Sequence, residues 1–234
     1  MLFHASSVEA RKTSRTTTPR RQCENQTMND IRKPRTLILG SSSRYRRELL
    51  ERLRLPFEVF APDLDESPLP DETPLQLASR LALAKAHAIA RQFPHAIVIG
   101  SDQVADLNGL AIGKPGSHQR AVEQLTAMSG QAVIFHTVVA VVCAETNFSA
   151  VDIAPVRVKF RHLSAAEIEN YLLAETPYDC AGSAKSEGLG ITLLSAIESD
   201  DPTALIGLPL IRTSQLLRQA GLEPLLELNK GVAA

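Results

Sequence analysis

Residues 96–103 read Ala-Ile-Val-Ile-Gly-Ser-Asp-Gln, an apolar run that ends on a glycine and passes directly into polar residues. A short apolar run without alternation is typical of a strand that is buried on both faces. Strands of this kind belong to α/β proteins, in which ligands gather beyond the carboxyl ends of the strands. We therefore expect Asp102 at the carboxyl end of a central strand, where open sheets place their chemistry.

A second strand is predicted at residues 36–39, and the loop after it has the features of an anion site. The loop Gly40–Ser43 consists of small residues, and a helical pattern follows over residues 44–55. Small residues let a ligand approach the backbone, and the amide groups and dipole of a helix start favour an anion. Arg46 or Arg47 would add forked donors for phosphate oxygens. No Gly-Lys-Ser/Thr follows, so this is not a Walker loop, and a solvated basic helix start would produce the same pattern.

Further strand and helix patterns alternate along the chain. Asn108-Gly109 is typical of a type I′ hairpin turn. Thr73 with Pro74 predicts one helix start, and Ser164 with Glu167 forms a capping box that predicts another. We expect strands at residues 57–60, 133–143 and 156–160, and helices at residues 75–92, 119–128, 164–176 and 209–220. This alternation predicts the α/β class.

The composition indicates a globular chain without a strong overall field. Of 234 residues, 44% are hydrophobic and 22% are charged, which is enough apolar material to bury a core. The formal net charge is -1, so attraction for a polyanion must come from local clusters of Lys and Arg, and we expect no nucleic-acid partner. The longest apolar stretch, residues 132–144, is shorter than the roughly 20 residues of a membrane span. We expect a soluble chain with no membrane partner.

The cysteines and histidines show no pattern of a metal site or a disulfide framework. The cysteines are odd in number and widely spaced, which suits structural or free thiols in a reducing compartment and predicts a cytoplasmic protein. They are Cys23, Cys143 and Cys180. Ligand spacing is missing for the histidines too, and we expect structural roles for His87, His118, His136 and His162.

The first 35 residues differ from the rest of the chain. They are basic and rich in Ser and Thr, with almost no apolar periodicity, which predicts disorder or a wrongly assigned start with Met28 as the true one. Acidic residues within this segment argue against a transit peptide, because transit peptides contain few of them. We expect three segments: an extension at 1–35, a folded domain at 36–226 and a tail at 227–234.

Asp102, Lys85 and Lys114 are residues from which a triphosphate site could be built. A nucleoside triphosphate carries about four negative charges, so its hydrolysis needs nearby cations and a carboxylate that accepts a proton from water. A Mg²⁺ or Mn²⁺ ion between Asp102 and the phosphate oxygens would remove the repulsion between them. Glu66, in the acidic loop 63–66, is the natural second acidic group for metal or water. Taken singly, each of these residues could equally form a surface ion pair.

Six motifs in one order together resemble the Maf family of nucleoside triphosphate pyrophosphatases. They are Gly40-Ser41-Ser42-Ser43-Arg44-Tyr45-Arg46-Arg47, Asp65-Glu66, Lys85-Ala86, Gly100-Ser101-Asp102-Gln103-Val104, Gly113-Lys114-Pro115 and Ala181-Gly182-Ser183-Ala184-Lys185-Ser186-Glu187-Gly188. The resemblance extends from about residue 36 to residue 225. It implies an α/β, ITPase-like fold, with a mixed, elongated sheet flanked by helices and two lobes around a central cleft. It also implies a homodimer.

The resemblance implies roles for individual residues. It makes Asp102 the proton acceptor and Glu66 the second acidic residue, both beside the metal. The catalytic lysines and the phosphate-binding residues that it implies are Lys85, Lys114, Ser41, Ser43 and Arg46. The family usually has proline where this chain has Arg44, and losing proline loosens the helix start slightly or adds a phosphate contact.

Three positions resemble the subgroup that hydrolyses 7-methyl-GTP to 7-methyl-GMP and diphosphate, by attack of water at the α-phosphate. They are Tyr45, Gln103 and Glu187, where the dTTP and UTP subgroup has Arg, Thr and Gln. Methylation at N7 makes guanine cationic, so an aromatic face would attract it, and a carboxylate could accept from its N1 and N2 hydrogens. Tyr45 could instead pack on its own helix. A dTTP, UTP or other noncanonical nucleotide substrate, and a non-catalytic role in septum formation, remain alternatives.

Overall fold

The computed structural model describes residues 35–227 of the chain. The expected extension at 1–35 and the tail at 227–234 lie outside this range, apart from Arg35 and Glu227. Within 35–227, no helix is long and apolar enough to cross a membrane.

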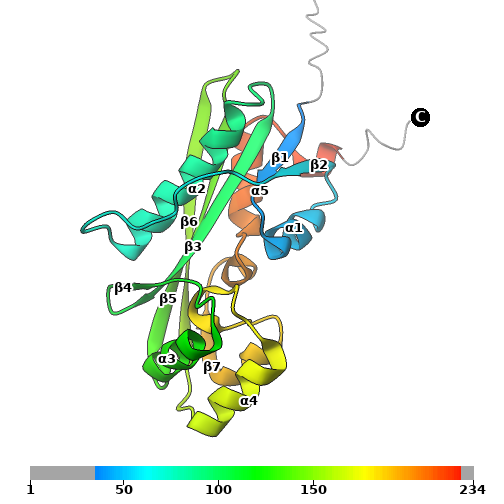
Figure 1. The fold of residues 1–234 in the computed structure, drawn as a ribbon. Helices are drawn as coiled ribbons and strands as arrows, with labels where there is room; N and C mark the ends of the chain where they lie inside the picture. Colours follow the sequence, from blue (N-terminus) through cyan, green and yellow to red (C-terminus); the bar gives the residue numbers. More distant parts are fainter. Residues whose placement is uncertain (1–34, 228–234) are drawn as a thin grey trace, which may run out of the picture. The chain divides into compact units, whose positions relative to one another are not determined.

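The core of the fold is one mixed sheet of seven strands (Figure 1), as the predicted class requires. Its spatial order is β2-β1-β3-β5-β6-β7, with β4 paired to β3. The strands β2, β1 and β3 are parallel, and all other pairs are antiparallel. The bounds are β1 Leu37–Gly40, β2 Phe57–Phe60, β3 Ile97–Leu107, β4 Leu110–Ile112, β5 Ala132–Cys143, β6 Phe148–Phe160 and β7 Leu194–Glu198.

Asp102 does not lie at the end of its own strand, so this part of the sequence prediction is wrong. The strand β3 continues to Leu107, and Asp102 pairs with Val138 of β5. The polar residues interrupt the apolar pattern, but hydrogen bonds to β5 keep the backbone extended through them. It is β1 that ends here, because its pairing with β3 stops at Gly40 and Gly100.

The early end of β1 leaves a gap along one edge of β3. The pairing of β3 with its antiparallel partner β4 begins only at Ala105, so residues 101–104 pair with no strand on that edge among residues 35–227. Asn108 and Gly109 form the turn between β3 and β4, and both have positive φ angles of 53° and 87°, as the predicted type I′ turn requires. Asp102 lies on this unpaired stretch of β3.

The helices begin at side-chain caps that mostly follow the sequence prediction. Ser43 caps the first helix, and capping boxes start two others at Thr73 and Ser164. The first helix is shorter than predicted, since it ends at Glu51 and Arg54 adopts a left-handed φ of 56°. The bounds are α1 Arg44–Glu51, α2 Pro74–Ala90, α3 His118–Met128, α4 Ala165–Glu175, α5 Leu210–Gln219 and α6 Pro224–Glu227, with short 3-10 helices η1 Ala181–Ser183, η2 Leu189–Leu193 and η3 Ala204–Ile206.

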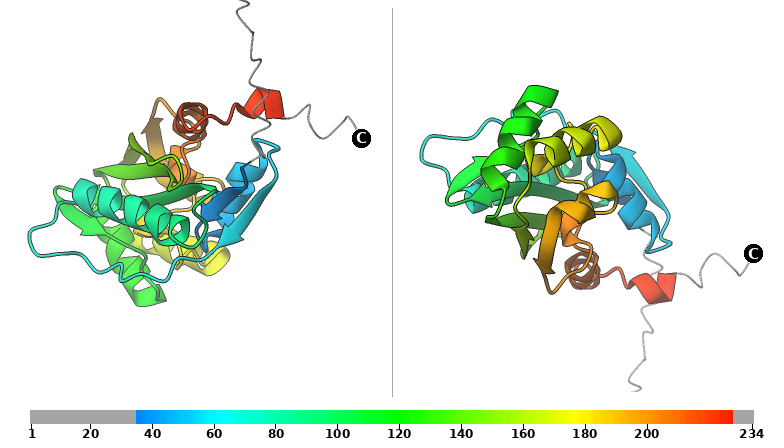
Figure 2. Two further views of the ribbon diagram at one scale, coloured as in Figure 1. Left: turned by 90° about the horizontal axis from the view of Figure 1, so that it is seen from above. Right: turned by 90° about the horizontal axis from the view of Figure 1, so that it is seen from below.

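Alternation along β3 sends neighbouring residues to opposite faces of the sheet. Val98 belongs to the apolar cluster that α2 covers, whereas Ile99 belongs to the cluster covered by α1 and α5. The two layers can be followed in Figures 1 and 2. A third cluster lies beyond the gap, where α3 and α4 pack on β5 and β6. Asp102 therefore shares the face of α2, and Gln103 the opposite face.

Gly100 lets α2 lie directly on β3. A Cβ atom at this position would come within 2.3 Å of the Ala82 carbonyl oxygen and 2.6 Å of the Ala86 nitrogen. Lys85 lies in the same turn of α2 as Ala82 and Ala86. The close approach at Gly100 therefore holds Lys85 near Asp102, two residues further along β3. The close approach of helix and strand thus places the two charged groups together.

Replacing Gly100 by alanine should push α2 away from the sheet. We expect Gly100→Ala to lower the free energy of unfolding by roughly 1–3 kcal/mol or more, because backbone atoms must move to admit the methyl group. Urea unfolding measures the change. Gly113→Ala is the control, since a Cβ there would meet no atom within 4 Å. Equal unfolding midpoints for the two variants would contradict the expectation.

Candidate functional site

Lys85 lies between two carboxylates, beside the unpaired stretch of β3. Its Nζ donates to Asp102 Oδ1 at 2.6 Å and lies 2.9 Å from Glu66 Oε1. The side chains of Lys85 and Asp102 are 6% and 9% exposed, whereas that of Glu66 is 53% exposed. The structure thus brings together three of the residues singled out in the sequence. A buried cation and a buried anion this close stabilise each other's charge, while Glu66 remains accessible from solvent.

The charge around Glu66 is dominated by cations. Burial works against ionisation of its carboxyl group, but the hydrogen bond and charge of Lys85, together with Lys114 and Arg46, outweigh it and lower the pKa of Glu66. Lys114 is exposed, in the loop between β4 and α3. Both predicted lysines therefore act on the same carboxylate, although they lie in different parts of the chain.

Arg46 is anchored so that part of its guanidinium group remains for a ligand. Its Nε donates to the Gly207 carbonyl oxygen at 2.8 Å, which fixes the side chain and leaves the two terminal nitrogens. Burial lowers the pKa of Arg46, and the charges of Asp102 and Glu66 oppose that shift. A half-buried guanidinium group within the electrostatic reach of two carboxylates is well suited to a phosphate group.

The serine loop is built as the sequence predicts. Ser43 accepts from the Arg46 backbone nitrogen at 3.4 Å as the N-cap of α1, and Ser41 accepts from the Ser43 nitrogen at 3.1 Å. A hydroxyl group that accepts can still donate, so both serines retain a hydrogen for an anion. The loop follows the end of β1, at the edge of the gap.

A small cavity of about 70 Å³ extends from Arg46 and Lys114 to the predicted specificity residues. The remaining residues that line it are Tyr45, Gln103, Asp179, Cys180, Ala181, Ala184, Glu187, Leu205, Ile206 and Gly207. This cavity is smaller than the several hundred Å³ of a typical small-molecule site. The cavity nevertheless brings all three predicted specificity positions to one place.

Tyr45 forms one wall of this cavity and has contacts both with its helix neighbour Arg44 and with the segment after α4. Its hydroxyl accepts from Arg44 Nη2 at 2.7 Å and lies 3.5 Å from Asp179 Oδ1 and 3.8 Å from Cys180 Sγ. The Arg44 guanidinium also lies over the ring, 4.7 Å from its centroid. One face of the ring is therefore already occupied by a cation, and a cationic base would need the other face or the place of Arg44.

Gln103 is held by the segment around η3. Its Nε2 lies within hydrogen-bond distance of Thr137 Oγ1 at 2.9 Å and of the Ala204 and Leu205 carbonyl oxygens at 3.0 Å. This leaves Oε1 as the acceptor that a ligand could use. Gln103 therefore also fixes the wall of the cavity, a role that its sequence motif did not reveal.

The loop that carries Glu187 is tied to α4. Lys185 Nζ pairs with Glu175 Oε1 at 2.6 Å, and the other oxygen of Glu175 accepts from the Leu189 nitrogen at 2.8 Å. The Tyr171 hydroxyl accepts from the Lys185 nitrogen at 3.0 Å. The lysine of the Lys-Ser-Glu-Gly motif thus fixes the loop, while Glu187 is exposed at the cavity.

Two cavity residues, Asp179 and Gly207, were not identified from the sequence. Both lie in segments without regular periodicity, after α4 and after η3. Gly207 has a φ of 123°, a conformation that side chains disfavour, and its carbonyl accepts from both Arg46 and Ser101. A glycine before Leu208-Pro209 was the only available signal, and it does not indicate which partner the carbonyl would have.

The carboxylates fit a metal ion that is shared with phosphate. No cluster of three or more His, Cys, Asp or Glu residues in the described range could form a protein-only metal site. Mg²⁺ and Mn²⁺ accept one or two carboxylates together with water and phosphate oxygens. Asp102 and Glu66 provide two such oxygen donors on either side of Lys85.

Two of the histidines singled out in the sequence, His118 and His136, have side-chain partners in the structure. His118 lies 2.9 Å from the Tyr178 hydroxyl, and His136 lies 3.1 Å from Asp106. Cys143 and Cys180 are free thiols, and Cys23 lies outside the described residues. Burial raises the pKa of Cys180 to about 11, so this thiol is not a ready nucleophile despite its place at the cavity.

Comparison with known proteins covers nearly the whole described chain. Residues 36–220 match the family model described as Maf-like protein. A 7-methyl-GTP pyrophosphatase of Polaromonas sp. is 68% identical over 187 residues, which cover 80% of this chain and 85% of that protein. A protein of the same name from Albidiferax ferrireducens is 66% identical over 191 residues, 82% of this chain and 96% of the relative. Among solved structures, a HAM1 protein from Coxiella burnetii is similar over 54% of this chain and 73% of its own, with 18% identity and a TM-score of 0.41.

Proposed function

Because the chain belongs to the Maf family, we propose that it is a nucleoside triphosphate pyrophosphatase that hydrolyses 7-methyl-GTP to 7-methyl-GMP and diphosphate. The observation that supports this best is the contact of Lys85 with both Asp102 and Glu66, at 2.6 and 2.9 Å. A general base, a second carboxylate and a cation between them are what hydrolysis of a charged phosphoanhydride needs.

Asp102 is the proposed general base. Lys85 donates to Oδ1, which leaves Oδ2 to accept a proton from water. The water oxygen bonds to the α-phosphorus as the bond between that phosphorus and the bridging oxygen breaks, and diphosphate leaves. The proton goes to Asp102, so no covalent intermediate with the protein is required.

The cations of the site stabilise the negative charge that develops during this step. Lys85 is buried beside the base, and Arg46 is held by Gly207 with its terminal nitrogens available for phosphate oxygens. Lys114 reaches the same region from the exposed loop after β4. The loop of Ser41 and Ser43 adds hydroxyl and amide donors at the start of α1. Donors that are already in place before the reaction stabilise developing charge effectively, and Lys85 and Arg46 are held in this way by Asp102 and Gly207.

Asp102 and Glu66 would hold a Mg²⁺ or Mn²⁺ ion together with the phosphates. When bound, the ion supplies charge neutralisation and polarises the phosphoryl group. The exposure of Glu66 lets this carboxylate turn toward such an ion without unfolding the loop. Lys85 would then remain paired with Asp102, the more buried of its two partners.

The cavity next to Arg46 is the proposed base-binding region. Glu187 would accept from N1 and N2 of guanine, and Asp179 adds a second carboxylate that favours a cationic base over a neutral one. Tyr45 offers an aromatic surface, with its hydroxyl near Asp179. This combination of negative charge and aromatic surface supports 7-methyl-GTP over dTTP or UTP.

Changing Glu187 to glutamine should remove the preference for guanine. We expect Glu187→Gln to lower kcat/KM for 7-methyl-GTP by about 10- to 100-fold. The glutamine amide has only one acceptor oxygen, so it cannot accept from both the N1 and the N2 group of guanine as the carboxylate can. Hydrolysis of UTP should change less than threefold if the carboxylate does not contact the phosphates. Glu58→Gln, on the exposed strand β2, is the matched control. Equal losses for both substrates would argue against base recognition by Glu187.

A panel of nucleotides tests the function as a whole. Diphosphate release from 7-methyl-GTP, GTP, dTTP and UTP should be fastest for 7-methyl-GTP and should require added Mg²⁺ or Mn²⁺. Faster release from UTP or dTTP would favour the other subgroup of the family. No release from any nucleotide would support a non-catalytic role such as septum-formation control.

A cytoplasmic location and a homodimer complete the proposal. The free thiols Cys143 and Cys180 suit a reducing compartment, and the resemblance to the family supports the dimer. Sedimentation equilibrium of the full chain would separate a dimer from a monomer.

A further inference from the structure

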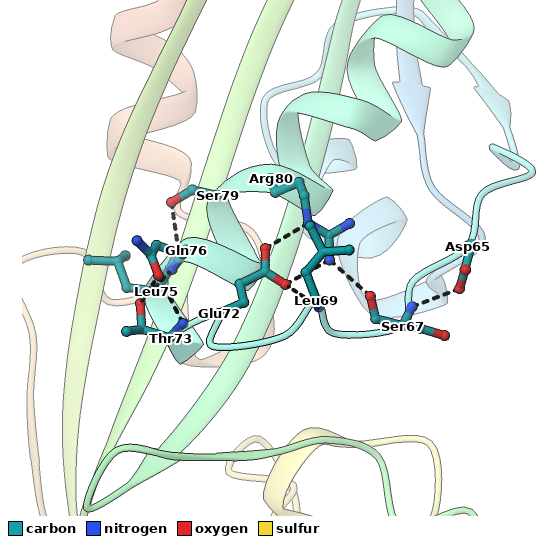
Figure 3. A network of polar contacts seen from close by, with 9 residues as sticks. All are labelled: Asp65, Ser67, Leu69, Glu72, Thr73, Leu75, Gln76, Ser79 and Arg80. Carbon is teal, nitrogen blue, oxygen red and sulfur yellow. Dashed lines mark hydrogen bonds and ion pairs between the residues drawn. The ribbon is translucent and has the colours of Figure 1, made fainter.

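A second ion pair, Arg80 with Glu72, anchors the loop that carries Glu66 to α2. Arg80 of α2 contacts Glu72 with both branches of its guanidinium group, Nε to Oε1 at 2.6 Å and Nη2 to Oε2 at 2.8 Å. Nη2 also donates to the Ser67 carbonyl oxygen at 3.0 Å. Figure 3 shows how these bonds connect the helix to two points of the loop, with Ser67 directly after Glu66.

The loop has few other means of keeping its shape. It comprises residues 61–73, between β2 and α2, and most of its residues are exposed. Apart from the pair of Glu66 with Lys85, the other contacts of the loop within residues 35–227 are local, such as Ser67 nitrogen to Asp65 Oδ1 at 2.9 Å and Leu69 nitrogen to Glu72 Oε2 at 3.0 Å. An exposed segment with so little apolar burial opens easily unless polar contacts fix it.

Glu72 is the point where these contacts meet. Its side chain is 7% exposed and accepts from Arg80 and from the Leu69 nitrogen. The hydrogen bond from Arg80, followed by that from Leu69, lowers the pKa of Glu72 to about 2. The pair therefore remains ionised at every pH at which hydrolysis would be measured.

We propose that Arg80 is a positioning residue, which clamps Glu72 and the Ser67 carbonyl so that Glu66 reaches Lys85, and which affects hydrolysis only through Glu66. The inference rests on the proposed role of Glu66. Arg80 and Lys85 lie on the same helix, five residues or roughly 7.5 Å of helix axis apart. One helix thus carries both the partner of Glu66 and the anchor of its loop.

Three variants separate a clamp from a simple charge effect. Arg80→Gln and Glu72→Gln each break the clamp, whereas Arg80→Lys keeps the charge but cannot form the two-branched contact. In the protein without substrate or metal, we expect the loop amides of Ser67 and Leu69 to exchange hydrogen about tenfold faster in the first two variants. Arg80→Lys should restore only part of the protection. If Arg80→Gln does not fold, Glu72→Gln still tests the clamp, because it breaks the same contact from the other side.

A double-mutant cycle then tests whether Arg80 acts through Glu66. We expect Arg80→Gln to lower kcat by about 5- to 20-fold alone, and by less than twofold in a Glu66→Gln background. The control is Arg161→Gln, since Arg161 also pairs with a glutamate, Glu167, and donates to a loop carbonyl, that of Thr192. It should leave kcat unchanged.

The outcomes distinguish this inference from the proposed function. Independent effects of Arg80→Gln and Glu66→Gln on kcat, or unchanged loop exchange, would overturn the inference alone. Full activity of Glu66→Gln would overturn the role of Glu66 and the inference together. Full rescue of kcat by Arg80→Lys would show that the charge of Arg80 acts directly and would also overturn the clamp.

Discussion

Asp102→Asn should fold like the wild type and hydrolyse 7-methyl-GTP about 10² to 10⁴ times more slowly, the range expected when a general base is lost. Asparagine has nearly the shape of aspartate, so β3 can keep its pairing with β5 at this position. It can still accept from Lys85, but it cannot take a proton from water. The loss should appear in kcat more than in KM, because binding of the phosphates depends mainly on the cations.

A second aspartate on β3, Asp106, provides a control for this variant. Asp106 lies on the same strand and pairs with His136 at 3.1 Å, away from the catalytic set. Asp106→Asn should therefore keep a kcat close to that of the wild type. Single-turnover diphosphate release, together with thermal unfolding of both variants, makes the comparison. Near-normal turnover in Asp102→Asn would show that Asp102 is not the general base.

Local signals in the sequence were enough to predict most of the fold. The Thr73-Pro74 helix start and the capping box of Ser164 with Glu167 depend on residues at most three positions apart, so the sequence contains both partners of each signal. The turn at Asn108-Gly109 is local in the same way. The length of β3 was not predictable, because its continuation past Asp102 depends on β5, which follows about thirty residues later and bonds only after folding.

The candidate site divides in a similar way. Asp102, Glu66 and Lys85 belong to motifs that could be recognised, and in the structure the Lys85 Nζ lies within 2.9 Å of an oxygen of each carboxylate. The anchors of the site could not be recognised, since Gly207 acts through a backbone carbonyl and Arg80 through a pair with a loop residue. Backbone acceptors have no residue-type signature, and an Arg–Glu pair in a sequence resembles any surface ion pair.

The contact between Lys85 and Asp102 also makes a prediction about stability. Lys85→Met removes the cation from a buried pair and leaves Asp102 as a buried charge without its partner. We expect the free energy of unfolding to fall by roughly 3–5 kcal/mol, the usual cost of breaking such a pair. Turnover should fall by about 10² to 10³, since a fixed positive group near the developing charge is lost.

The double variant distinguishes an unpaired charge from a general loss of packing. In Lys85→Met with Asp102→Asn neither member of the buried pair carries a charge, and the other partner of Lys85, Glu66, is 53% exposed and is solvated by water. The double variant should therefore recover most of the stability that Lys85→Met loses, although its activity should stay at or below that of Asp102→Asn. Urea unfolding of the wild type, both single variants and the double variant measures the coupling. If the two losses of stability simply added, Lys85 would be supporting the fold through its packing against α2 and β3, and its charge would matter only for the bound phosphates.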